Sequence, residues 1–302
     1  MRLIILSVVL LLALAAICVS GPAQSDAQLV SFSATPCLKI NDFYVLYTNP
    51  VSPFVDRDGN VYAPLAELTA LLGDLSDTYD ARSASLTIVE KQNRYTLSVK
   101  HLNGLSLPPF GAILPAAFQV EADASIFVRV QPVLSALKIP FQWIPERKLL
   151  QIRDKYALEG ELQSIQNDSP MVAIHGDVNS IVPRKYYMTI RQVRGASSIP
   201  FRLHLLIQND SNRALYNGCT VIVNYDPAAS DYSDPDMLAA NLISEPNQYH
   251  YRLAPGKAYS LMARDDIPAS YLRVDSVLLL CTNISKSTAD WLSQTNGMGG
   301  PP

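Results

Sequence analysis

The chain has 302 residues, enough for about two domains with buried cores. Its 24 lysine and arginine residues and 27 aspartate and glutamate residues give a formal net charge of −3, which argues against a nucleic-acid-binding protein. Apolar residues make up 48% of the chain, which excludes a mainly disordered protein. Charged residues are only 17%, and 21 prolines outnumber 13 glycines, a mixture that favours strands and rigid loops over long charged helices.

The N-terminus carries the pattern of a secretory signal peptide. Arg2 precedes an apolar run that extends to Val19, and small residues follow it. We therefore expect a signal peptide over residues 1–23, cleaved at its end or, alternatively, after Ala27. An uncleaved N-terminal anchor is the other interpretation, because the run is only slightly shorter than a membrane span, and membrane contact is expected only in that case. A linker over 24–38 would follow, in a protein that is secreted or extracytoplasmic, in the cell envelope or periplasm.

A strand–helix–hairpin pattern occurs twice in the first half, over 60–88 and over 125–152. In the first copy, leucines three and four residues apart predict one buried face of a short helix. Pro64 suits the first turn of this helix and Gly73 suits the position just past its end. In each copy an aromatic residue then opens a hairpin whose return strand has alternating apolar side chains. The duplication predicts two similar units packed together.

At these residues the chain resembles the copper amine oxidase N-terminal-like domain, or stalk domain, of exported bacterial proteins. The matching motifs, in chain order, are Ala63-Pro64-Leu65, Leu72-Gly73, Tyr79-Asp80 and Leu86-Thr87-Ile88. The second copy keeps Trp143 and the last strand, but has Arg129 and Lys138 where the motif has proline and glycine. The resemblance implies an α+β stalk domain over 39–154, an antiparallel sheet wrapped on a helix, with no catalysis and no metal.

From about residue 155 the pattern changes to short strands separated by turn residues. The predicted strands cover 186–193, 201–208, 219–225, 249–253, 258–263 and 276–282. Strands of this number and length predict an all-β sandwich of immunoglobulin-like class over 155–292. Three elements follow one another here: a strand ending in Gln208-Asn209, the run Thr220 to Asp226, and Leu253-Ala254-Pro255-Gly256-Lys257 before a strand. With these elements the segment also resembles FxLYD-type sandwich domains of exported bacterial proteins. We expect a disordered tail over 293–302.

Cys219 and Cys281 lie in two of these predicted strands. Export would permit a disulfide bond between them, across the sandwich. The alternative is a pair of buried thiols that behave as small apolar residues, and the sequence leaves both open. Cys37 is left over near the start of the mature chain.

Several segments carry residues typical of metal sites, and each has a plainer interpretation. Residues 56–60 resemble the start of a calcium loop, but Val61 stands where that loop needs glycine, so a hairpin turn is favoured. The acidic stretch 226–236 is either a weak calcium site or a solvated loop. Residues 224–226 copy the Asn-Tyr-Asp around the cofactor tyrosine of copper amine oxidases, yet the four histidines are too scattered to bind copper. A basic cluster, expected to be the solvated face of a strand, consists of Arg184, Lys185, Arg191 and Arg194.

The sequence contains no motif of a nucleophilic hydrolase, a metalloprotease, a phosphate-binding loop or a dinucleotide site. We therefore predict no catalytic residue, no metal ligand, no cofactor and no nucleic-acid partner. The expected function is that of an exported, non-enzymatic binding or spacer module for a protein or a cell-wall polymer. The alternatives are an envelope-polymer hydrolase whose site is built from distant residues, and an envelope assembly subunit that offers sheet edges for strand addition.

Overall fold

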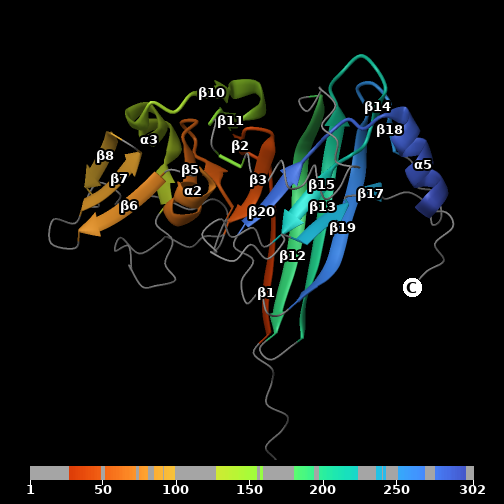
Figure 1. Ribbon diagram of the computed structural model, residues 1–302, viewed down its shortest axis with the longest axis horizontal. Helices are drawn as coiled ribbons and strands as arrows, with labels where there is room; N and C mark the ends of the chain where they lie inside the picture. Colours follow the sequence, from red (N-terminus) through yellow and green to blue (C-terminus); the bar gives the residue numbers. More distant parts are fainter. Residues whose placement is uncertain are drawn as a thin grey trace, which may run out of the picture.

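The computed structural model describes residues 27–48, 52–72, 75–80, 85–90, 92–98, 127–154, 157–158, 180–193, 197–223, 236–239, 241–242, 251–268 and 276–296. Over these residues the protein is mostly β-strand in several sheets, with few helices (Figure 1). The predicted signal peptide, Gly73 and residues 224–226 lie outside the described residues. Within the described ranges, no helix combines the length and the apolar character that crossing a bilayer requires.

A seven-stranded sheet forms the middle layer of the molecule (Figure 1). Its strands, in spatial order, are β10 (Phe141–Ile144), β11 (Leu149–Ile152), β2 (Leu38–Ile40), β3 (Phe43–Thr48), β20 (Ser276–Leu280), β15 (Thr220–Val223) and β16 (Asp236–Ala239). Neighbours are antiparallel except β11 and β2, which are parallel. Because β3 pairs with β20, this sheet contains strands from both sides of residue 154. The domain limits 39–154 and 155–292 stay a prediction, and the hydrogen-bonded sheet continues across them.

A five-stranded antiparallel sheet packs against one face of the middle sheet. Its spatial order is β1 (Ala27–Ala34), β12 (Ile181–Val193), β13 (Ser198–Asn209), β19 (Ala258–Pro268) and β17 (Asn241–Leu242). Alternate side chains of its long strands, such as Met188 and Leu203, enter one apolar cluster with Val221 and Leu279 of the middle sheet. This period of two is what places one face of a strand in the core and the other in solvent. A small sheet of β14 (Leu215–Tyr216) and β18 (Arg252–Leu253) completes this half.

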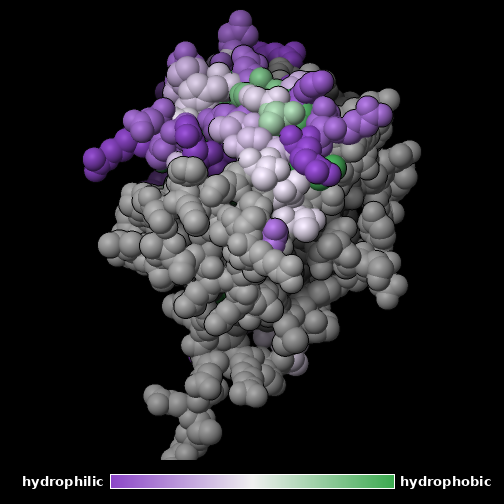
Figure 2. Space-filling model, turned by 90° about the vertical axis from the view of Figure 1, so that its left-hand side faces the viewer, coloured by the Kyte–Doolittle hydropathy of each residue, from purple (hydrophilic) through white to green (hydrophobic). Residues whose placement is uncertain are grey.

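The other face of the middle sheet packs against α2 (Leu65–Leu71) and α3 (Val130–Leu137). The helices sit with two three-stranded sheets at the left of Figure 1. The first sheet comprises β4 (Phe54–Val55), β5 (Val61–Pro64) and β9 (Phe127–Arg129), and the second β6 (Leu75–Asp80), β7 (Ser85–Glu90) and β8 (Asn93–Ser98). Leu68 of α2 and Leu134 of α3 are both buried in this layer, as the leucine spacing predicted for α2. Where Figure 2 colours this end of the molecule, the surface is mainly hydrophilic.

The duplicated pattern is present in the structure, since β5, α2, β6 and β7 recur in the same order as β9, α3, β10 and β11. The first strands of the two copies pair antiparallel, and Ala63 lies directly opposite Val128, its equivalent in the repeat. Such a register relates these two strands by a local two-fold axis. Lys138, which replaces the glycine of the motif, has a φ of 62°, the left-handed conformation that glycine would adopt there.

Two segments differ from what the sequence predicted. The range expected as a linker, 24–38, contains β1, which pairs along its whole length with β12. Its partner lies about 150 residues away, so no local pattern announces it. The second half was expected to contain strands only, but α5 (Lys286–Asn296) is a helix and extends into the predicted tail. Ser285 begins it, because its Oγ accepts the Thr288 N–H at 3.0 Å.

Candidate functional site

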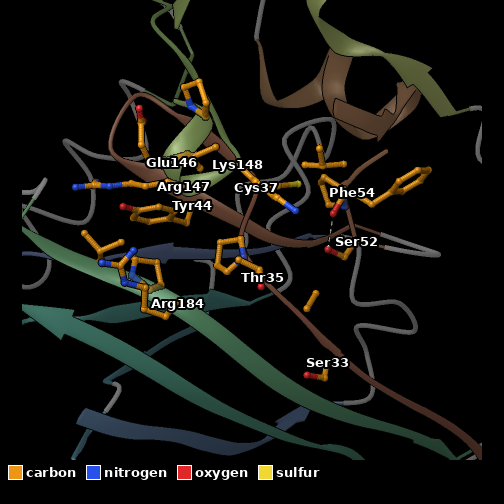
Figure 3. Close-up of a pocket in the computed structure, with 18 residues that line it drawn as sticks. Ser33, Thr35, Cys37, Tyr44, Ser52, Phe54, Glu146, Arg147, Lys148 and Arg184 are labelled. Atoms are coloured by element: carbon orange, nitrogen blue, oxygen red, sulfur yellow. Dashed lines mark hydrogen bonds between the residues drawn. The ribbon is translucent and has the colours of Figure 1, made fainter. Parts of the chain in front are cut away.

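The candidate site is a cleft of about 500 Å³ (Figure 3). It lies where the five-stranded sheet, the middle sheet and the β4–β5–β9 sheet meet. The cleft is lined by residues 33–37, Tyr44, residues 52–55, 145–149 and 182–184. Each segment ends or joins a strand, so the sheets hold the lining in place. Junctions between layers are common positions for ligand sites, because they leave a concave surface that the cores do not fill.

The floor of the cleft includes Tyr44, which the neighbouring strand supports. Tyr44 lies opposite Lys39 in the β2–β3 pair, and the Lys39 Nζ lies 4.9 Å from the centre of the Tyr44 ring. Lys39 is only 1% exposed, and burial lowers the pKa of its ammonium group to about 8, although the nearby Asp42 opposes this change. Burial also raises the pKa of the Tyr44 hydroxyl above its usual range. A cation over a ring face fixes the position of both groups.

One side of the cleft is cationic. Arg147, from the short 3-10 helix η2 (Pro145–Arg147), and Arg184 of β12 lie on the same side in Figure 3. Both pair with Asp210, at 3.2 Å and 2.8 Å respectively. Lys148 also lines the cleft and is exposed, and the only acid in the described lining is the exposed Glu146. The described rim therefore keeps an excess of positive charge.

A buried amide positions the shared carboxylate. Asn209 is fully buried and donates its Nδ2 hydrogens to the carbonyls of Arg213 and Leu253, at 2.8 and 2.9 Å. The Asp210 N–H is bonded to the Ser180 carbonyl at 2.8 Å. These hydrogen bonds fix the backbone of Asp210 independently of the arginines. Its carboxylate therefore orients both guanidinium groups at the rim.

The opposite side of the cleft is tied to β12 by a tyrosine. The Tyr186 hydroxyl contacts the Leu46 carbonyl and lies 2.7 Å from the Ser52 Oγ. Burial raises the pKa of Tyr186, so the phenol stays protonated and can donate. This contact fixes the segment that brings Phe54 into the wall, and Phe54 in turn stacks on Tyr62 with ring centres 5.2 Å apart.

Cys37 is the only cysteine among the residues that line the cleft. Burial raises the pKa of its thiol to about 12. The thiolate is the nucleophilic form of cysteine, so Cys37 is an apolar wall residue at neutral pH and not an activated nucleophile.

The structure brings together the two cysteines singled out in the sequence. Cys219 and Cys281 are both buried, and their Sγ atoms lie 2.7 Å apart. Cys219 directly precedes β15 and Cys281 directly follows β20, so they meet at the end of two neighbouring strands of one sheet and not across two facing sheets as expected. Neither cysteine lines the cleft, although both belong to the apolar cluster that contains Tyr44 of its lining.

The segments considered for metals behave as follows. Residues 56–60 form the turn of the β4–β5 hairpin, in which the Asp56 carboxylate accepts the N–H groups of Asp58 and Asn60 at 2.9 Å. These bonds lower the pKa of Asp56 against the opposing effect of its desolvation. Most of the acidic stretch 226–236 lies outside the described residues. Within the described part of the chain, no three His, Cys, Asp or Glu side chains are placed to hold one metal ion.

The predicted basic cluster is divided between two surfaces. Arg184 belongs to the cleft, whereas Lys185 and Arg191 are exposed on the other side of β12, and Arg194 lies outside the described residues. The sequence did not predict Arg147 or Asp210 as site residues, because they reach the cleft from separate segments. The only feature near them in the sequence is a predicted turn, and a turn alone does not identify a site residue.

Comparison with known proteins adds no relative: no family model, no curated protein and no solved structure matches this chain.

Proposed function

We propose that the protein is an exported, non-enzymatic binding module, and that its cleft binds an acidic, apolar segment of a partner protein. The single observation that carries the proposal is an apolar cleft whose described lining holds three cations, Arg147, Lys148 and Arg184. Aromatic and proline walls favour apolar side chains, while arginine and lysine at the mouth favour carboxylates.

The chemistry of the lining favours binding over hydrolysis. Hydrolysis of a polymer by paired carboxylates would need two acids facing one another across the cleft. Glu146 is the one carboxylate among the residues that line it, and it is exposed. Cys37 is held as a thiol by burial. The hydrolase and assembly-subunit interpretations stay predictions that no feature of the cleft favours.

We also propose the finer fold that the sequence suggested, a stalk-type α+β domain followed by an immunoglobulin-like sandwich. The duplicated order of elements and the packing of α2 and α3 on one face of the middle sheet support the first part. The apolar cluster shared by two facing sheets supports the second. Fold alone does not fix function, so the proposal for binding depends on the cleft.

The proposal is tested with the full chain and anilinonaphthalene sulfonate, a small apolar anion that fluoresces when it leaves water. We expect saturable binding to the folded protein, and slower hydrogen exchange in residues 33–37, 52–55 and 145–149 when the dye is bound. Lys148→Glu should weaken binding several-fold, whereas Arg94→Glu, the same charge change on an exposed position of β8, should not. Equal binding by the two variants, or protection elsewhere only, would overturn the proposal.

A further inference from the structure

The outer face of the five-stranded sheet carries cations that the cleft does not use. Side chains that alternate with the buried ones on β12, β13 and β19 point away from the core. Four of them are basic and exposed: Lys185, Arg191, Arg202 and Arg264. We call these four residues, with Tyr187 and His204 between them, the basic face. It shares no residue with the cleft, although Lys185 follows Arg184 directly.

Two of the cations lie directly opposite each other. Arg202 on β13 pairs in register with Arg264 on β19, and its other neighbour in the row is the uncharged Thr189 of β12. Like charges directly opposite on neighbouring strands destabilise a sheet. In the described part of the chain, the arginine ion pairs join Arg147 and Arg184 to Asp210, and Arg153 to Asp42. Neither Arg202 nor Arg264 takes part in them. Asp266, exposed two residues further along β19 on the same side, is not in ion-pair contact with either arginine in the described part of the chain. The arginine pair therefore keeps room for a carboxylate from outside the chain.

The next row of the same face is aromatic. Tyr187 lies opposite His204, with ring centres 6.3 Å apart and planes tilted by 47°. Tyr187 remains 44% exposed, so part of its ring is open to a ligand. Neighbouring rows along a strand are roughly 7 Å apart, which places these rings beside the arginine pair. Rings beside arginine forks suit a ligand that has flat apolar surfaces and carboxylates in alternation.

We propose that the basic face binds a linear acidic polysaccharide, with its carboxylates on Arg202 and Arg264 and a sugar ring on Tyr187. From Lys185 to Arg191 the strand extends roughly 20 Å, enough for several consecutive sugar units. A lipid surface suits this face less well, because Leu206 is the only large aliphatic side chain among the described exposed ones, and one such side chain gives no apolar face to enter a bilayer. The net charge of −3 argues against nucleic acid.

The test measures binding of the full chain to immobilised polygalacturonate, a linear polymer of uronic acids. We expect Arg202→Glu/Arg264→Glu to weaken binding at least tenfold, and rising salt to weaken the wild type. The matched control is Arg57→Glu/Arg94→Glu, which changes net charge equally at exposed positions of the first half and should stay within twofold of the wild type. If the glutamate variant does not fold, Arg202→Gln/Arg264→Gln replaces it and should also bind at least several-fold more weakly.

Three results would overturn the proposal. The first is wild-type affinity in the folded Arg202/Arg264 variants. The second is equal binding to the methyl-esterified, uncharged polymer. The third is a wild type that does not bind polygalacturonate, whether or not it binds vesicles of phosphatidylglycerol; binding to the vesicles alone would identify a membrane as the partner.

Discussion

Cys219 and Cys281 face each other at the end of the β15–β20 strand pair of the middle sheet, one residue beyond each strand, with their Sγ atoms 2.7 Å apart. Next to them, the Gly218 N–H donates to the Thr282 carbonyl at 3.0 Å. The cysteines therefore occupy the adjacent pair, in which no backbone hydrogen bond joins the two residues and the chains approach most closely. Both are thiols in the structure. Burial raises the pKa of the Cys219 thiol, and the Cys281 sulfur beside it adds to this effect.

We predict that these two residues form a disulfide when the protein folds in an oxidising compartment. The two thiols would lose two protons and two electrons to a disulfide of the surrounding medium. Peptide mapping without reduction should recover one linked peptide that contains both residues, with Cys37 alkylated after denaturation. Reduction should then lower stability by about 2–4 kcal/mol, and Cys219→Ala should abolish the effect of the reductant. Recovery of both as alkylated thiols from the oxidised protein would contradict the prediction.

The end of α3 offers a stabilising substitution. Lys138 lies in the left-handed region, and the Ile139 N–H bonds the Leu134 carbonyl at 2.9 Å to close the helix. Lys138→Gly should raise the free energy of unfolding by about 0.5–1 kcal/mol, because glycine has no Cβ to strain this conformation. Urea unfolding measures the change. Lys138→Ala is the matched control, since it removes the same charge and retains a Cβ, and it should not stabilise; equal gains in both variants would attribute the effect to charge.

Lys39 predicts a particular dependence of stability on pH. Burial lowers the pKa of its ammonium to about 8, so the folded state releases this proton before the unfolded chain does. Lys39 should therefore contribute a rise of roughly 2 kcal/mol in the free energy of unfolding between pH 7 and 9.5. The buried thiols of Cys37 and Cys219, whose pKa is raised, act in the opposite direction in the upper part of this range, so the Lys39 contribution is read as the difference between wild type and variant. Lys39→Met, which keeps the length of the side chain, should lose this rise. Lys257→Met, at an exposed turn, should keep it, and identical pH profiles for wild type and Lys39→Met would refute the prediction.

Asp210 should limit the affinity of the cleft for anions, because it pairs with both Arg147 and Arg184. Asp210→Asn frees both guanidinium groups and should tighten binding of anilinonaphthalene sulfonate roughly threefold or more. Fluorescence titration measures this, with Asp265→Asn, an exposed aspartate on β19, as the control of equal charge. Unchanged or weaker binding in Asp210→Asn would show that the arginines do not face the ligand.

Local patterns predicted much of the secondary structure but not the partners of the strands. The leucine spacing predicted α2, and six predicted strands of the second half are present as β12, β13, β15, β18, β19 and β20. Nothing near residues 43–48 indicates that they pair with 276–280, because period and turn residues carry no information about a distant strand. The helix α5 was missed, although Ser285 was available as its cap.

The candidate site was predictable only in fragments. The sequence drew attention to Arg184 as part of a basic cluster, but alternation along β12 sends Arg184 to the cleft and Lys185 to the opposite face. Arg202 and Arg264 lie on other strands, and only the register places them opposite each other. A surface assembled from several strands exists only once the strand order is known.

The pairing of β3 with β20 also sets the order in which the protein can assemble. Residues 43–48 need residues 276–280 to complete the middle layer, and β1 needs β12. Contacts this distant along the chain make folding slow, because a large loop must close before its strands are stabilised. During synthesis the N-terminal strands must wait for the last ones. Slow closure of this kind leaves the edges of β1 and β3 without their distant partners for the longest part of synthesis, so these edges are the parts of the new chain most exposed to strand pairing with another molecule.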